Sequence, residues 1–314
     1  MVTGKINNFT VIISSVLIFP LQISAGISVR VNNELQDQSF SYFIMSGDSV
    51  TISMEQHHLS DWFLITPVRK AYSNLNSTDD EHGLRVDSLK YTIHELRRTD
   101  ESVRFIAGTT PCFPECGTFY IARDIPYTPA DTITALEPLH TLYPSEIVQF
   151  SIRTDDTYMG YLMELMNTPF IMTPRNTPGG NHQADDRLGS DCAAFAIYGR
   201  RREGYDFRYL GPRGIYAYLE PLYDEQFYPS EQGDIYIYMS ESGNSIEIRE
   251  EKLQPGDILH FCEQVSVFYE DRGIEGLLDS EDILIQSWFN GPHFCMIREN
   301  GFFGLPVSVY RWID

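Results

Sequence analysis

Hydrophobic and polar positions alternate through the first half of the chain, from Ile27 to about residue 155. The runs "ISVRVNN", "SFSYFIMSGDSVTISM" and "GTFYIARDI" have the period of two that is typical of half-buried strands. The Ser-Gly-Asp sequence inside the second run indicates a turn between two strands. Short strands separated by turns favour antiparallel pairing, so the pattern predicts an all-β sandwich over residues 27–150.

The pattern changes after residue 150. In "DDTYMGYLMELMNTPF" apolar side chains recur at helical spacing, and a second, apolar helix is predicted to begin at Cys192. Further along, "LQPGDILHF", "QVSVFYED", "DILIQSWF" and "PHFCMI" are short strand-like runs separated by turns. Helices followed by a later antiparallel sheet predict an α+β domain over residues 151–314.

Residues 1–26 have the features of a cleavable signal peptide. One lysine precedes an apolar run from Val11 to Phe19, and the small residues Ser24, Ala25 and Gly26 follow it. The run is shorter than the ~20 residues of a membrane span, so we expect no stable membrane insertion after its removal; an uncleaved anchor is the alternative. The segment predicts a periplasmic or secreted protein.

The acidic charge of the chain narrows the classes of partner. Against 23 Lys and Arg stand 44 Asp and Glu, which gives a formal net charge of -21. Such a surface repels phosphate backbones and anionic membranes, so we expect no nucleic-acid partner. A solvated acidic surface accounts for this charge, and affinity for cationic or polymeric wall material is the functional alternative.

Five cysteines in an exported chain leave one thiol over if the others form disulfides. Cys112 and Cys116, in "TPCFPECG", are near enough in sequence for a local disulfide. Cys262 and Cys295 both lie in strand-like segments and are the second predicted pair. The odd thiol is then Cys192, although spacing alone leaves the connectivity open.

Cys192 is the first residue of interest for chemistry. Asp191 is a good N-cap, and the unpaired N–H groups and dipole of a helix start favour a thiolate. The following residues, 193–198, are apolar all round and predict a buried helix that holds the sulfur rigidly. Cys192 is therefore either a nucleophile with a lowered pKa or one more small buried residue.

The combination of "NTPF", a Gly-rich loop, "SDCAAF" and "LQPGDILHF" resembles the NlpC-type cell-wall endopeptidases of the papain-like cysteine peptidase superfamily. The resemblance covers about Met159 to the C-terminus and does not reach the sandwich. It implies an α+β papain-like domain with Cys192 as the nucleophile. It also implies a histidine base, a polar residue that orients this base, and amide bonds of peptidoglycan stem peptides as the substrate.

Two positions depart from the family pattern. Gln264 stands where the family has its catalytic histidine, and glutamine cannot take a proton from a thiol. Gln286 matches the orienting residue, since its amide oxygen can accept from an imidazole N–H. Phe170 stands where the family has a tyrosine that polarises the reacting carbonyl. A second alignment makes His293 the base, and His260, in "ILHF", is a third candidate.

Other chemistry has little support in the sequence. No spacing of His, Cys or acidic residues predicts a metal site, and no phosphate or dinucleotide loop predicts a cofactor. Arg213, in the turn-like "GPRG", is the predicted carboxylate-binding residue, next to Asp191 and Phe170 in the expected cleft.

Two functions follow from these features. The first is a thiol hydrolase of peptidoglycan stem peptides or a related amide, with the sandwich as a wall-docking module. The alternative is a catalytically silent protein that binds cell-wall fragments or a protein partner. The sequence predicts no oligomeric state.

Overall fold

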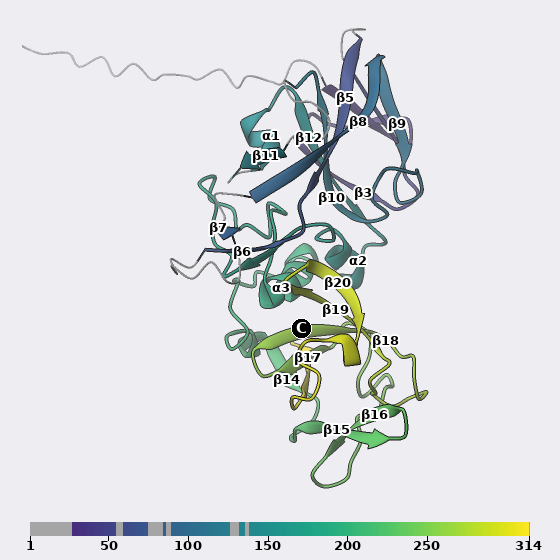
Figure 1. Cartoon of the computed structure of the whole chain (residues 1–314), viewed down its shortest axis with the longest axis vertical. Coiled ribbons are helices and arrows are strands. Elements are labelled where there is room, and N and C mark those ends of the chain that lie inside the picture. The colour runs from purple at the N-terminus through teal and green to yellow at the C-terminus, as the bar shows by residue number, and fades with distance from the viewer. Residues whose placement is uncertain are drawn as a thin grey trace, which may run out of the picture.

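The computed structural model describes residues 27–54, 59–74, 84–85, 89–125, 132–135 and 138–313. The predicted signal peptide, residues 1–26, lies outside these. The molecule is elongated, with a β-sandwich at one end, two helices at the middle and further sheets at the other end (Figure 1). We call residues 27–153 the first half and residues 154–313 the second half.

Two sheets form the sandwich, one with the strand order β2-β1-β4-β9 and one with the order β11-β8-β5-β10-β12-β3. All strand pairs in them are antiparallel except β12 with β3. The bounds are β1 Ile27–Val31, β2 Glu34–Leu35, β3 Ser41–Met45, β4 Ser49–Met54, β5 Ser60–Pro67, β8 Leu89–Asp100, β9 Ser102–Ile106, β10 Gly117–Arg123, β11 Thr132–Ala135, α1 Leu139–Leu142 and β12 Ile147–Arg153.

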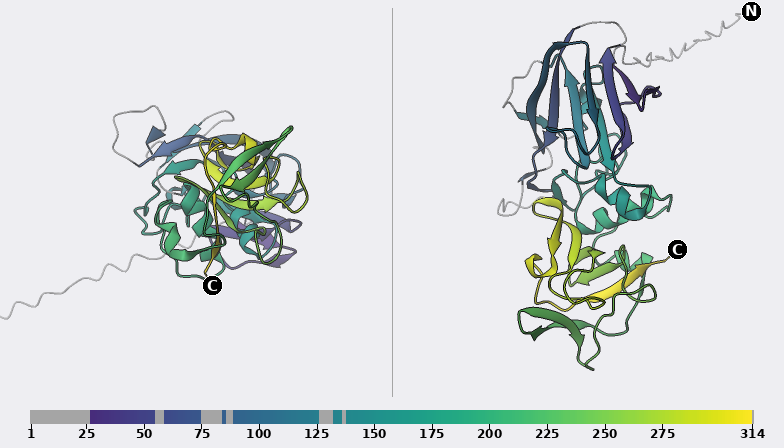
Figure 2. Two further views of the ribbon diagram at one scale, coloured as in Figure 1. Left: turned by 90° about the horizontal axis from the view of Figure 1, so that it is seen from below. Right: turned by 90° about the vertical axis from the view of Figure 1, so that its right-hand side faces the viewer.

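The alternation in the sequence explains how the two sheets pack. Val29, Val50 and Ile52 point inward and form one core with Trp62 and Phe119 of the facing sheet. The residues between them point outward, as expected for strands with one face buried. Figure 2 shows the two sheets face to face.

The second half contains a six-stranded antiparallel sheet with the order β14-β21-β17-β18-β19-β20, and a two-stranded β15-β16 ribbon. A small parallel sheet, β13-β6-β7, takes strands from both halves. The bounds are β6 Ala71–Ser73, β7 Leu84–Arg85, α2 Tyr158–Met163, β13 Phe170–Met172, α3 Cys192–Arg202, β14 Leu219–Pro221, β15 Phe227–Gln232, β16 Ile235–Ser240, β17 Ile258–Phe261, β18 Gln264–Glu270, β19 Ile283–Trp288, β20 Gly291–Met296 and β21 Ser308–Trp312, with 3-10 turns at Ile215–Tyr218 and Ile297–Glu299.

The predicted combination of a sandwich with an α+β papain-like domain is wrong. Strands make up 46% of the structure and helices 11%, distributed over several sheets. The helical spacing after residue 155 yields only the six residues of α2, because the chain then turns to pair the carbonyl of Met166 with the N–H of Thr118. Within the described residues, α3 alone is a helix of ordinary length. Among the described residues, no helix is long and apolar enough to cross a membrane.

Helices α2 and α3 pack closely at the middle of the molecule. A Cβ atom at Gly199 would lie 2.6 Å from the ring of Tyr158, so this crossing has room only for glycine. The Tyr158 hydroxyl donates to the carbonyl of Ala196 at 3.1 Å. Residues of α3 then continue into a core with β18 and β19.

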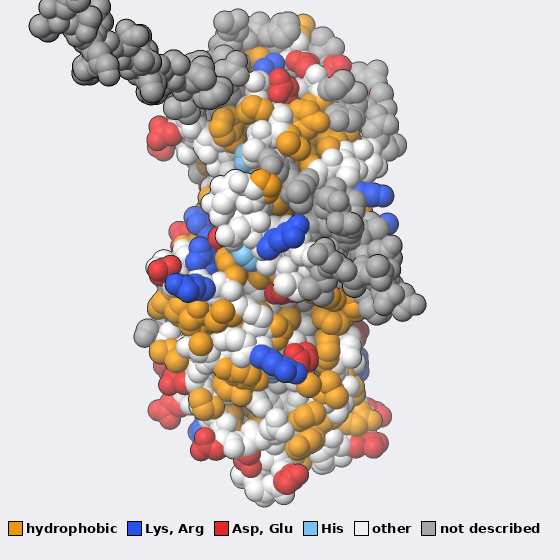
Figure 3. Space-filling view, turned by 90° about the vertical axis from the view of Figure 1, so that its left-hand side faces the viewer, with side chains coloured by type: hydrophobic (Ala, Val, Ile, Leu, Met, Phe, Trp, Pro, Cys, Tyr) orange, Lys and Arg blue, Asp and Glu red, His pale blue; other side chains and the backbone are white. Residues whose placement is uncertain are grey.

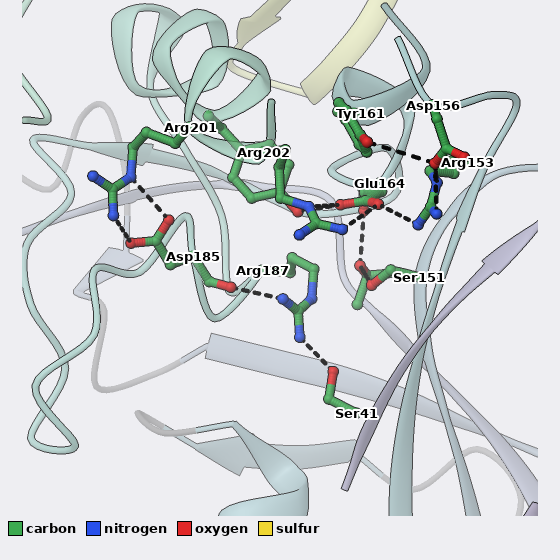
Figure 4. Close-up of polar contacts among 12 residues, drawn as sticks. Ser41, Ser151, Arg153, Asp156, Tyr161, Glu164, Asp185, Arg187, Arg201 and Arg202 are labelled. Atoms are coloured by element: carbon green, nitrogen blue, oxygen red, sulfur yellow. Dashed lines mark hydrogen bonds and ion pairs between the residues drawn. The ribbon is translucent and has the colours of Figure 1, made fainter. Parts of the chain in front are cut away.

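A buried ionic network joins the two halves (Figure 4). At its centre is Glu164, directly after α2, whose side chain is completely buried. Its carboxylate accepts from Arg202 of α3 at 2.8 Å and from Arg153, at the end of β12, at 3.2 Å. The hydroxyl of Tyr198 also donates to it. One carboxylate thus ties the last sandwich strand to both helices.

A second part of this network is centred on Arg187, in the loop before α3. Its guanidinium donates to the side-chain oxygens of Ser41 and Gln149 in the sandwich and to the carbonyl of Asp185. The Asp185 carboxylate in turn pairs with Arg201 of α3.

On the face in Figure 3, basic side chains gather around the middle of the molecule and acidic ones lie around the lower end.

Candidate functional site

Helix α3 begins at Cys192, as predicted. Asp191 is extended (φ -85°, ψ -177°), and its side chain accepts from the N–H of Ala194 at 2.8 Å. This is the N-cap arrangement expected for Asp. The predicted buried run 193–198 is also buried in the structure.

The thiol of Cys192 is sealed in the core. The residue is 3% exposed, and its Sγ donates a weak hydrogen bond to the carbonyl of Glu263 at 3.9 Å. Burial, and then the negative charge of Asp191, raise the pKa of Cys192 to about 12. The expected lowering of the thiol pKa at the helix start is therefore wrong, because loss of solvation outweighs the backbone N–H groups.

The two glutamines at the predicted base and orienting positions contact each other and not the thiol. Gln264 Nε2 donates to Gln286 Oε1 at 2.9 Å. Val265 and Val267 pack in the core that holds Cys192, whereas Phe268 packs in another core. Since side chains alternate along a strand, Gln264 lies on the face of β18 opposite α3.

Gln286 lies in the same polar row. Its Oε1 also accepts from Ser266 at 2.9 Å, and its Nε2 donates to the sulfur of Cys295 at 3.3 Å. His293, on β20, pairs in register with Gln286. Its Nδ1 donates to the carbonyl of Gly291 at 2.8 Å. The row runs across three strands, away from Cys192.

Both ring nitrogens of His260 form hydrogen bonds to groups other than the Cys192 thiol. Its Nε2 donates to the carbonyl of Pro212 at 3.0 Å, so its Nδ1 is the acceptor for the hydroxyl of Tyr216, also at 3.0 Å. Burial lowers the pKa of His260. Within the described part of the chain, no histidine is hydrogen-bonded to the Cys192 thiol.

The predicted substrate-binding residues are engaged within the protein. Phe170 is buried and packs edge-on against Trp288, with ring centroids 5.5 Å apart. Arg213 is exposed and forms an ion pair with Glu263. Asp191 is the helix cap, and burial raises the pKa of its carboxyl to about 6. Each of the three therefore has a partner within the protein.

All five cysteines are free thiols in the structure, so neither predicted disulfide is present. Cys262 lies in the tight turn between β17 and β18 (φ 57°) and is exposed. Cys295 is in the Gln286 row on β20. Cys112 is exposed, in the loop between β9 and β10, and Cys116 is half-buried behind it.

A different site lies at the junction of the two halves. A pocket of about 700 Å³ opens between β5, β8 and the loop that carries Cys112. Its floor is the edge of the sandwich core, with Leu64, Leu96 and Phe113. Phe113 is held by stacking on Phe105, with ring centroids 4.3 Å apart. Both the volume and the mainly apolar lining are in the range of small-molecule sites.

Three hydrogen bonds between the halves fix the rim of this junction pocket. Arg69 Nε and Nη2 donate to the carbonyls of Asn290 and Pro292, in the β19-β20 hairpin, each at 2.8 Å. Asn167 Nδ2 donates to the carbonyl of Cys116 at 2.6 Å. Arg69 Nη1 has no partner among the described residues. The rim therefore offers guanidinium N–H groups beside an apolar floor, a combination that suits a carboxylate attached to an apolar group.

Sequence reasoning missed the junction pocket because its residues are far apart in the chain. Arg69 and Asn167 meet only through the packing of the two halves. One signal for the junction was present: Glu164 is the only charged residue in the apolar stretch "YMGYLMELM", which is typical of a buried, paired carboxylate. In the described residues, no cluster of His, Cys, Asp and Glu is arranged to hold a metal ion.

Neither a protein-family model, nor a curated protein, nor a solved structure matches the chain.

Proposed function

We propose that this protein binds a peptide at the junction pocket and does not cleave it. The observation that carries the proposal is the sealed thiol of Cys192 against the Glu263 carbonyl. Burial raises the pKa of the Cys192 thiol to about 12, so the thiol stays protonated at pH 7. A nucleophile needs the thiolate and a path for the substrate, and burial opposes both.

The chemistry of the pocket supports a peptide with a free carboxylate as the ligand. An apolar side chain can lie on Leu64, Leu96 and Phe113, and the carboxylate can accept from Arg69 Nη1. Thr66 and Asn167 add polar groups at the wall. Cell-wall stem peptides, the partner expected from the sequence, combine short side chains with free carboxylates and are the proposed class.

Calorimetric titration with a synthetic stem tetrapeptide, and mass spectrometry of the same sample, tests this proposal. We expect binding with the peptide recovered intact. Arg69→Gln should weaken binding about tenfold, because a hydrogen bond to a charged group is worth about 1.5–3 kcal/mol. Thr66→Trp should abolish binding, because the indole occupies the pocket.

Arg97→Gln is the matched control, since it removes the same charge from exposed residue 97 on β8, outside the pocket lining. Its affinity should equal that of the wild type. Cleavage of the peptide that disappears in Cys192→Ala would establish the hydrolase in place of the binding protein. Binding that is unchanged in Thr66→Trp would place the ligand elsewhere.

A further inference from the structure

A groove on the outer face of the sheet β2-β1-β4-β9 carries two arginines in one row. Arg30 of β1 pairs in register with Thr51 of β4, and Thr51 pairs with Arg104 of β9. All three line a groove of about 380 Å³. Because neighbouring strands are about 4.8 Å apart, the two arginine backbones are about 10 Å apart on one face.

Both guanidinium groups are available to a ligand. Their neighbours Val29 and Val103 point into the sandwich core, so Arg30 and Arg104 point outward, and both are exposed. Arg30 Nη1 donates to the carbonyl of Asn33 at 3.2 Å. Neither arginine forms an ion pair with a carboxylate in the described part of the chain. Two such cations in one groove stand out in a protein with a net charge of -21.

The rest of the groove is rich in hydroxyl groups. Ser49, Thr51, Ser53 and Ser102 line it between and beside the arginines, together with the amide of Asn33. Hydroxyl and amide side chains both donate and accept hydrogen bonds, as the hydroxyls of sugars do. The lining thus matches a ligand that carries many hydroxyl groups and a few negative charges.

We propose that this arginine groove binds a chain of acidic sugars, with carboxylates on Arg30 and Arg104 and sugar hydroxyls on the serines and Thr51. Glu101 also lines the groove and opposes any polyanion, so the hydroxyl groups decide between the ligands. DNA fits less well, because its sugars have no free hydroxyl groups along the chain for the serines and Thr51 to bind. The groove shares no lining residue with the junction pocket, so this site is separate from the proposed peptide site.

Titration of the protein with a hexamer of galacturonic acid tests the acidic-sugar site. We expect saturable binding that weakens as salt is added, and no binding of the neutral galactose hexamer. Arg30→Gln and Arg104→Gln should each weaken binding about three- to tenfold, and the double variant should lose at least about thirtyfold.

The double variant Arg249→Gln/Arg272→Gln is the control, since it removes two exposed arginines from the second half. Its affinity should stay within about twofold of the wild type. Equal losses in the two double variants, equal binding of the neutral hexamer, or no binding of the acidic hexamer would each overturn the proposal. So would tighter, arginine-dependent binding of a single-stranded DNA oligomer. Titration of the same variants with the stem tetrapeptide reports separately on the junction pocket, where no change is expected.

Discussion

Two cysteines in this molecule occupy opposite environments. Cys192 begins helix α3 and is 3% exposed, with its sulfur against a backbone carbonyl. Cys112 lies exposed in a loop and lines the junction pocket. The apolar residues after Cys192 make its motif conspicuous in the sequence, but the same residues bury the thiol. A motif describes a local segment, whereas access to a ligand depends on how distant segments pack.

The largest expected effect is a difference in thiol reactivity. At pH 7.5, iodoacetamide should alkylate Cys112 and Cys262 at least about a hundredfold faster than Cys192, because burial removes both solvent access and thiolate from Cys192. Peptide mass spectrometry over time measures the three rates. In urea, where the chain unfolds, the rates should converge. Rapid labelling of Cys192 in the folded protein would show that its thiol is accessible and would reverse the comparison.

The next effect concerns the junction that holds the pocket together. Glu164→Ala leaves Arg202 and Arg153 without their buried partner, which should lower the free energy of unfolding by about 3–5 kcal/mol. Urea unfolding followed by tryptophan fluorescence measures this change. Glu247→Ala is the control, because Glu247 forms an exposed ion pair with Arg249 and its loss should cost at most about 1 kcal/mol. Similar losses of unfolding free energy in both variants would mean that the junction network contributes little to stability.

The sequence predicts those features of the structure that depend on residues close together in the chain. It does not predict those that depend on residues far apart in the chain. Alternation predicted half-buried strands in the runs that contain Val29, Val50 and Ile52, and the capping residue predicted the start of α3, because both signals are local. The face of β18 on which Gln264 lies depends on where α3 packs, and a resemblance in motif order does not determine it. The junction pocket is lined by residues about 100 positions apart, such as Arg69 and Asn167, and no local pattern predicts that they come together.

A smaller effect should appear as a pH dependence at the start of α3. Burial raises the pKa of Asp191 from 3.8 to about 6, so the folded protein binds this proton more tightly than the unfolded chain. Stability should therefore fall as the pH rises from about 4 to 6, by about 1–3 kcal/mol, and should not change further above 6 from this group. Asp191→Asn keeps the helix cap and should remove that loss.

Urea midpoints at pH 4.5 and 7.5 measure this difference between Asp191→Asn and the wild type. Asp206→Asn, which changes an exposed residue after α3, is the control and should keep the wild-type pH dependence. An identical pH dependence in all three proteins would mean that the Asp191 carboxyl is solvated, and would weaken the case for a sealed Cys192.

The smallest predicted effect lies at the floor of the junction pocket. Phe113→Leu keeps an apolar side chain but loses the stacking on Phe105, which should cost about 0.5–1.5 kcal/mol of stability. The same change should weaken binding of the stem tetrapeptide about threefold, because the pocket floor loses the aromatic ring that stacking on Phe105 holds in place. Phe294→Leu is the matched control, since Phe294 packs against Tyr269 on an exposed part of β20, with ring centroids 4.6 Å apart. It should leave peptide affinity unchanged. If both variants bind alike, the ligand does not contact the floor beside Cys112, and the contrast between the two cysteines concerns exposure alone.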